Sequence, residues 1–443
     1  MSFIQRWFGS GKNKLEQPNI SFGRYSDAYK ETEQYESWDE SLAKFDKEKY
    51  LEAYKAFFVY LRDDEEENVK WWEEKDGLRF EIYQGSRKIV GFANDYKVRV
   101  EAKIARASKL KRDFLRRLME HNYNLRYSRF ALDHDNNITI TFDSFVLDGS
   151  PYKLYYAIKE LAINADKQDD LLLDEFGILA PIETGHLSEL PEVEKHTKYN
   201  FIIQEIQKTF DCIDHGKLDT ERYPGAVAYL LLHLSYKLDY LVKPEGYLME
   251  SLERIHRLYF AKKKEGTKEK NEVLRQELQK LLERPKADYF KEMYRVTATF
   301  GITTPVNHDR LAGFINGELG NMNWYLEEAY EEIALAVPGY IVGYCLFNYA
   351  VPKPDKAYLH FFYQVTEASY FRDLGFRPSY YDAEKQVFNQ KAIRRRVFEI
   401  AEENKTRFPH LNPNFGHLNF SSMSMFGKSY LEMIQNLNLT RID

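Results

Sequence analysis

Apolar and charged residues alternate along 78–83 and again along 97–104, on either side of a more apolar run at 88–94, and this period of two constrains the chain more than any other feature. The alternation indicates β-strands with one buried and one solvent-facing side. Along 109–122 the apolar residues recur every three or four positions, which is the period of a helix. Alternation returns between 127 and 143, and a long helical run follows Ser150, a good N-cap residue ahead of Pro151. These periods predict an antiparallel sheet packed on one face, with helices between its strands.

The same periods divide the chain into an α+β domain followed by an all-α domain. Residues 37–176 are expected to form the α+β domain, with an antiparallel five-stranded sheet and helices. Residues 1–36 read as an irregular leader, because they are polar and contain Gly, Pro and Asn. Glycine and proline recur in 177–198, which we interpret as a linker. From 199 to 443 the apolar residues keep a helical period, interrupted by Gly and Pro.

Three stretches are each expected to form one continuous helix. Apolar residues at helical spacing predict one helix from 38 to 61, ended by an acidic run. In the second domain, 323–350 and 355–374 read as two further helices.

The composition suits a protein with sizeable cores and excludes several classes. The chain has 443 residues, 44% of them hydrophobic, and a formal net charge of −6. Cys212 and Cys345 are its only cysteines, too few for a disulfide framework or a cysteine-based metal site. No apolar run reaches the roughly 20 residues that a membrane span needs. We therefore expect a cytoplasmic protein with both thiols reduced.

No motif indicates a cofactor, a metal or a reaction. The stretch Gly9–Lys12 resembles the end of a P-loop, but the first glycine of that motif is missing and no Ser or Thr follows the lysine. Glu253 and His256 have the Glu-x-x-His spacing of di-metal bundles, yet the second copy that such a site needs is absent. A surface Glu beside a partly buried His explains the pair better. We expect no enzyme activity, no cofactor and no metal.

Residues 97–129 form a strongly basic segment, with eleven Lys or Arg against three acidic residues and a net charge of +8. Such a segment could meet phosphates. RNA-binding sheets, however, stack bases on exposed rings, and the polar sides of the expected strands carry few rings. An acidic protein partner, or the chain's own acidic helix, accounts for the charge better, so no nucleic acid is expected.

The succession of elements within about 46–175 resembles the small chaperones of type III secretion and the related YbjN-like domains. Those domains run helix, three strands, helix, two strands, helix. Residues 109–122 (KLKRDFLRRLMEHN) look like the family's middle helix, and 130–140 (FALDHDNNITI) look like its second strand pair. Ala165-Asp166 suits the end of its last helix. The resemblance covers about 130 of the 443 residues and leaves the helical domain unrecognised.

The resemblance implies a sheet that binds extended segments of client proteins in apolar grooves or along an edge, without ATP. We therefore expect a non-catalytic, chaperone-like or adaptor protein of a bacterial cytoplasm. Its client would be a secreted effector or a toxin-like protein, and two copies could pair as a homodimer. The predicted contact residues are Phe57, Phe58, Phe80, Ile82, Val90, Phe92, Val98 and Val100.

Two other functions stay open at this point. The protein could be a fixed component of a larger assembly, docked through the helical domain, where Tyr and Phe are frequent. It could also be an enzyme with a site built from scattered His, Glu and Asp residues in that domain. Co-purification of this protein in constant stoichiometry with one multiprotein complex would favour the assembly function. A deep polar pocket with perturbed carboxylates would favour the enzyme.

Overall fold

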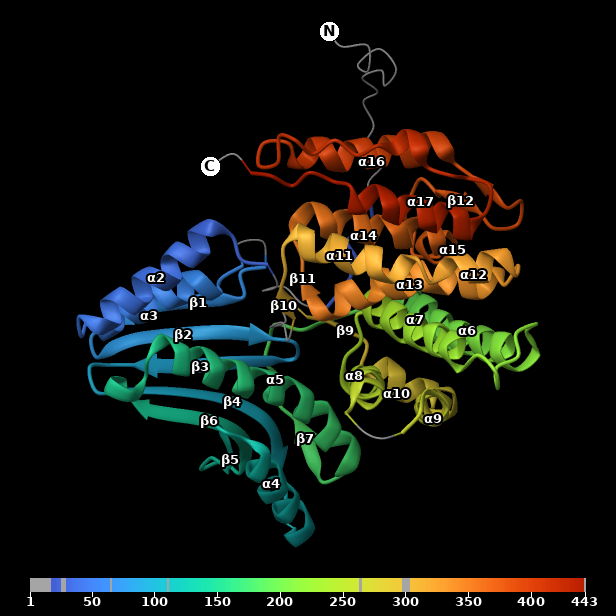
Figure 1. The fold of residues 1–443 in the computed structure, drawn as a ribbon. Helices are drawn as coiled ribbons and strands as arrows, with labels where there is room; N and C mark the ends of the chain where they lie inside the picture. The colour runs from blue at the N-terminus through green and yellow to red at the C-terminus, as the bar shows by residue number, and fades with distance from the viewer. Residues whose placement is uncertain are drawn as a thin grey trace.

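A computed structural model describes residues 17–24, 29–63, 66–109, 111–262, 265–296 and 303–441. The N-terminal part combines an antiparallel sheet with helices, and the part that follows is helical (Figure 1). This arrangement confirms the expected α+β domain followed by a helical region. None of the described helices has both the length and the apolar character needed to cross a bilayer.

Seven strands form the main sheet, in the order β1-β2-β3-β4-β6-β5 with β7 paired to β4. Every pairing is antiparallel. The strands are β1 Val69–Glu74, β2 Gly77–Gln84, β3 Arg87–Ala93, β4 Lys97–Ala107, β5 Arg129–Leu132, β6 Asn137–Phe145 and β7 Leu179–Pro181. The five expected strands correspond to β2 through β6. The sequence interpretation missed β1 and β7, so the sheet is larger than predicted.

Four helices belong to the sheet domain: α2 Thr32–Asp46, α3 Tyr50–Leu61, α4 Arg112–Asn124 and α5 Pro151–Glu175, with a 3-10 turn η1 at Val146–Asp148. The single helix expected over 38–61 is two helices. Glu48, between them, adopts a φ of +61°, a left-handed conformation that an α-helix cannot include. α5 begins as predicted, because Ser150 Oγ accepts a hydrogen bond from Lys153 N at 3.3 Å.

The core of this domain lies between one face of the sheet and the helices α3 and α5. Phe80, Gly91, Val100 and Phe142 are cross-strand neighbours that form one row across β2, β3, β4 and β6. Glycine is needed in this row, because a Cβ at Gly91 would lie 1.9 Å from the Phe80 ring. The buried apolar side chains that α5 adds to the core are Leu154, Ala157, Ile158, Leu161, Ala162, Ala165 and Leu172.

The helical part follows in chain order. Its helices are α6 Glu192–His215, α7 Pro224–Val242, α8 Gly246–Phe260, α9 Thr267–Glu283, α10 Lys286–Lys291, α11 His308–Leu319, α12 Met322–Glu327, α13 Glu331–Asn348, α14 Lys353–Thr366, α15 Ala368–Asp373, α16 Gln390–Asn404 and α17 Met423–Gln435. Its short elements are β8 Ser188–Glu189, β9 Tyr294–Arg295, β10 Thr304–Pro305, β11 Tyr349–Ala350, β12 Tyr381–Asp382, β13 Val387–Phe388 and the 3-10 turn η2 Phe415–His417. The helices expected over 323–350 and 355–374 are each divided, into α12 and α13 and into α14 and α15.

Helices α7 and α13 pack closely within the helical core. Two glycines of α13 allow this approach. A Cβ on Gly339 would lie 2.1 Å from the His233 ring, and a Cβ on Gly343 would lie 2.6 Å from Tyr236 Cβ. Larger residues at either position would push the two helices apart, because closely packed interiors leave no room for added atoms.

Residues 17–24, called the N-terminal strap below, lie against the helical part of the molecule. Gly23 N donates a hydrogen bond to Tyr240 O at 2.8 Å, and Arg24 reaches buried acidic residues of α7 and α8. The strap has no helix or strand, so the expected irregular leader over 1–36 is wrong only from Thr32, where α2 begins.

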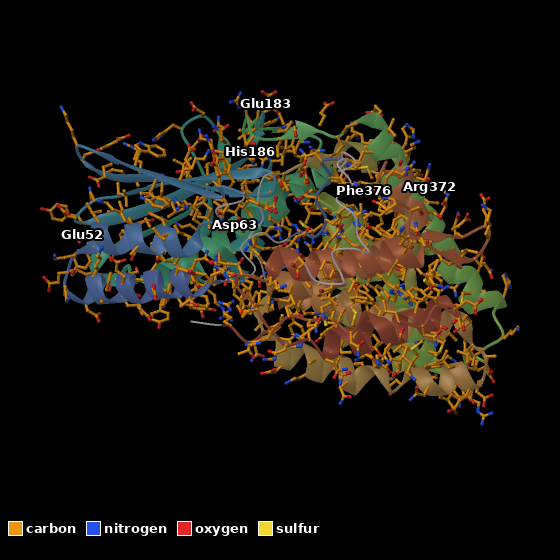
Figure 2. The ribbon with its side chains drawn as sticks, turned by 90° about the horizontal axis from the view of Figure 1, so that it is seen from above. Glu52, Asp63, Glu183, His186, Arg372 and Phe376 are labelled. Atoms are coloured by element: carbon orange, nitrogen blue, oxygen red, sulfur yellow. The ribbon has the colours of Figure 1, made fainter. Side chains whose placement is uncertain are left out.

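The predicted linker 177–198 is held by both parts of the molecule. β7 pairs with β4 of the sheet, β8 pairs with β9 of the helical part, and α6 already begins at Glu192. His186 Nε2 lies 3.1 Å from Gly85 O in the turn between β2 and β3. Figure 2 shows Glu183 and His186 at the boundary between the strands and the helices. The connection is therefore part of a tight contact rather than a free tether.

Candidate functional site

Six of the eight residues predicted to contact a client belong to the hydrophobic core. The residues with an exposed fraction of 0% are Phe57, Phe58, Phe80, Ile82, Val98 and Val100. The apolar groove predicted from them is therefore closed in this structure. Only Val90, which is 44% exposed, and the partly exposed Phe92 lie on the opposite face. Alternation separates the two faces of a strand, but it does not show which face helices will cover.

β1 is the last strand on one side of the sheet, and its outer edge is the candidate site. Residues of an antiparallel strand point their backbone groups alternately toward and away from the partner strand. Tyr83 N donates to Asn68 O at 2.9 Å, so Asn68 faces the partner. By this alternation Val69, Trp71 and Glu73 turn their N–H and C=O groups outward. The described part of the chain places no further strand there.

Aromatic side chains lie on both sides of this edge. On the helix side, the Trp71 ring stacks on Phe58 with centroids 5.9 Å apart, and the Arg62 guanidinium lies 5.3 Å from the Trp71 ring centroid. On the other side, Trp72 is 41% exposed. An extended segment laid along β1 would therefore meet one tryptophan on each face, and such rings are common anchors in binding surfaces.

The opposite edge of the sheet, at β5, is closed by a side chain. Asn122, near the end of α4, receives a hydrogen bond from Phe130 N at 2.6 Å and donates one to Phe130 O at 3.2 Å. These two bonds occupy the outward backbone groups of Phe130, as an added strand would. Natural sheets protect their edges in such ways. The two edges of this sheet therefore differ, and the β1 edge is the open one.

The face of the sheet opposite the helices carries charged and aromatic side chains, as the β1 edge does. Trp72, Arg79, Phe92, Arg99 and Asp143 form one cross-strand row on this face. The Arg79 guanidinium lies 4.9 Å from the Phe92 ring centroid, an arrangement that favours a cation over an aromatic face. A bound segment could extend its side chains toward this row.

Buried charges form a second cluster, where α5 meets the helical part. Asp166 accepts a hydrogen bond from Ser86 N at 2.8 Å. Asp169, one turn further along α5, pairs with Arg87. Both carboxylates contact the turn between β2 and β3. We call this cluster the domain junction. It also includes the nearby charged residues Arg24, Lys167, Asp170, Asp239, Glu245 and Glu253.

Basic side chains neutralise part of the domain junction. Arg24 of the N-terminal strap pairs with Asp239 at 2.8 Å and with Glu253 at 3.0 Å. Lys167 of α5 approaches Glu253 at 3.1 Å. These pairs connect the strap, the sheet domain and helices α7 and α8, and buried ions need such partners because removal from water is costly.

The remaining carboxyls of the junction favour the neutral form. Burial, reinforced by the charge of Asp169, raises the pKa of Asp166 to about 7. Burial also raises the pKa of Asp170, again with a contribution from Asp169, and that of Glu245. Glu253 is different, because Arg24 and Lys167 outweigh its burial and lower its pKa to about 2.

Perturbed carboxyls can mark catalytic sites, but this cluster leaves no room for a substrate in the present conformation. The small cavity that Glu245 and Tyr294 line has a volume of about 10 Å³, close to the space that one water occupies. Throughout the described ranges, no three His, Cys, Asp or Glu side chains are arranged to hold a metal ion. We therefore interpret the junction as a contact that fixes the sheet domain on the helical part.

A larger cavity, of about 760 Å³, lies between α15 and α16. Its size is within the range of small-molecule sites. Arg372 and Phe376, which Figure 2 labels on the helical part, belong to its lining. Several of its charged side chains pair with each other, as Arg396 does with Glu403 at 2.8 Å. The cavity therefore does not specify the chemistry of a ligand.

Two signals in the sequence could have located these features. Asp76-Gly77 is a strong hairpin signal, and it follows a run that contains Val69 and two tryptophans, so β1 was open to prediction. Asp166 and Asp169 continue the helical spacing of the buried residues of α5, which places both carboxyls on the inward face. The approach of the N-terminal strap to the helical part left no local signal.

No protein-family model and no curated protein sequence matches this chain. The resemblance to secretion chaperones and YbjN-like domains therefore stays a prediction, and the function must be argued from the geometry described above.

Proposed function

We propose that this chain is a non-catalytic, chaperone-like or adaptor protein that holds an extended segment of a client polypeptide along the outer edge of β1. The observation that carries the proposal is the difference between the two sheet edges. Asn122 occupies the outward groups of Phe130 in β5, whereas Val69, Trp71 and Glu73 of β1 face outward, and no strand within the described ranges pairs with them there. Strand addition uses such an edge, with main-chain hydrogen bonds for affinity and side-chain pockets for specificity.

The order of elements supports a secretion-chaperone-like domain. Helix α3, strands β2 to β4, helix α4, strands β5 and β6, and helix α5 follow one another in the order that the resemblance implies. β1 is an addition to that order, and it provides the open edge. The clients we propose are secreted effectors or toxin-like proteins, held in a reducing cytoplasm. Pairing of two copies stays a prediction.

Replacement of Glu73 tests the proposal. Glu73→Pro removes one outward N–H donor without touching the bonds to β2, because proline is tolerated at the free side of an edge strand. Peptides would first be selected from a display library on the full-length protein, and their affinities measured by fluorescence anisotropy. We expect Glu73→Pro to weaken binding by about fivefold or more, from the lost hydrogen bond and the intruding ring.

Glu73→Ala is the matched control, because it removes the same side chain and keeps the N–H. It should bind like the wild type. Equal binding by the Pro and Ala variants would contradict strand addition at β1, as would failure to select any peptide that binds the full-length chain.

A further inference from the structure

Helix α4 turns one apolar face into the core and a second one toward solvent. Phe114 and Leu118 are buried against the sheet domain. One position further along, Leu115, Met119 and Tyr123 recur at intervals of four and are 36%, 72% and 91% exposed. Large apolar side chains that line up on a surface usually mark an interaction site. We call these three residues the α4 stripe.

The surroundings of the α4 stripe are basic. Lys111 and the helix α4 together carry four basic residues against Asp113 and Glu120, a net charge of +2 in a chain whose net charge is −6. Arg116 pairs with Glu120 at 3.1 Å. Among the described residues, neither Lys111 nor Arg112 has an ion-pair partner. A partner for this surface must therefore be negatively charged and able to receive apolar side chains.

Two features favour a lipid surface over a protein. α4 forms the lower tip of the molecule in Figure 1, so the stripe lies on a projecting helix. A stable protein interface buries about 800 Å² on each partner, and three side chains on one helix supply only part of that area. A second copy is disfavoured as well, because it would bring together two helices that each carry a net positive charge.

We propose that α4 binds the surface of an anionic lipid bilayer, with Leu115, Met119 and Tyr123 inserted at the level of the headgroups and the surrounding Lys and Arg residues on lipid phosphates. Interfacial helices combine apolar side chains and basic residues in this way. The binding is peripheral, and it goes beyond polypeptide binding, because it assigns a different surface and a different partner. The β1 edge lies at the other side of the sheet order from α4 and β5.

Co-sedimentation with vesicles tests the proposal on the full-length protein. The probes are vesicles of equal parts phosphatidylglycerol and phosphatidylcholine, compared with vesicles of phosphatidylcholine alone. We expect binding to the anionic vesicles only, reduced by high salt. Met119→Glu with Tyr123→Glu should reduce binding at least tenfold. Arg112→Gln with Arg116→Gln should reduce it about 25-fold, because each basic residue near an anionic surface contributes about fivefold.

The matched control is Tyr96→Glu with Leu147→Glu. These residues are 77% and 72% exposed and lie beyond the opposite end of β4 from α4, so their replacement should leave vesicle binding unchanged. Absence of binding by the wild type would overturn the proposal. So would undiminished binding by the Met119→Glu, Tyr123→Glu variant, which would place the lipid contact elsewhere. Light scattering that shows this variant as a monomer and the wild type as a dimer would assign the stripe to a second copy instead.

Discussion

Replacement of Asp166 by Asn should remove the share of the pH dependence of stability that this one carboxyl of the domain junction contributes. The pKa of Asp166 is raised from 3.8 to about 7 in the folded protein, chiefly by burial. A carboxyl with a raised pKa contributes stability that is complete below its ordinary pKa and is lost as the pH rises through the folded value. Asp166 alone should therefore add about 2–3 kcal/mol to wild-type stability as the pH falls from 8 to 5, at up to about 1.4 kcal/mol per pH unit.

Asparagine has nearly the same shape, carries no charge at either pH and still offers an oxygen to Ser86 N. The gain in unfolding free energy between pH 8 and pH 5 should thus be smaller in Asp166→Asn than in the wild type by about 2–3 kcal/mol. Urea unfolding of the full-length chain at both pH values, followed by circular dichroism, measures this difference. Asp95→Asn is the matched control, because Asp95 is exposed in a turn and should keep the wild-type pH dependence.

Other carboxyls of the junction also contribute to the pH dependence of stability. The raised pKa values of Asp170 and Glu245 act in the same direction as that of Asp166, so some pH dependence should persist in the variant. Glu253, whose pKa is lowered to about 2, loses stability only as the pH falls below about 4.5, outside the range measured. An Asp166→Asn variant with the full wild-type pH dependence would refute the reasoning, because Asp166 would then be ionised throughout.

Three further substitutions probe the sheet and the strap. Phe92→Asp should fold normally and weaken binding of a selected peptide, because Phe92 lies partly exposed on the open face; a drop in melting temperature would place it in the core instead. Gly91→Ala should destabilise the chain by about 1–3 kcal/mol in urea unfolding, because its Cβ would overlap the Phe80 ring. Gly177→Ala is the control and should be tolerated, because its Cβ would meet no atom within 4 Å. Arg24→Met should cost about 3 kcal/mol, because it leaves two buried carboxylates without this cation, and the exposed Arg372→Met serves as its control.

Local periods in the sequence were sufficient to predict much of the sheet domain. Alternation predicted β2 and β4, a more apolar run between two turn signals predicted β3, and the change of period predicted α4 and the hairpin that follows it. Ser150 and Pro151 marked the start of α5 correctly. These features depend on neighbours within a few residues, so a single sequence contains the information for them.

The candidate site depends on long-range geometry, and most of the contact residues predicted from the sequence are buried in the core. Phe80 and Val100 alternate like residues of an exposed groove, yet α3 and α5 cover them. Whether an edge is open is decided by pairing, as when Asn122 bonds to Phe130 across a turn. Arg24 reaches Glu253, more than two hundred residues away, and no local pattern indicates such a contact.

The most direct test of the account is amide hydrogen exchange of the full-length protein with and without a peptide selected for binding. The outward N–H groups of Val69, Trp71 and Glu73 should exchange rapidly in the free protein and slowly in the complex, because the added strand would take up these donors. The amide of Phe130, already bonded to Asn122, should change little. Protection at β5 or within the helical part, with β1 unchanged, would contradict the assignment of the β1 edge as the polypeptide-binding site.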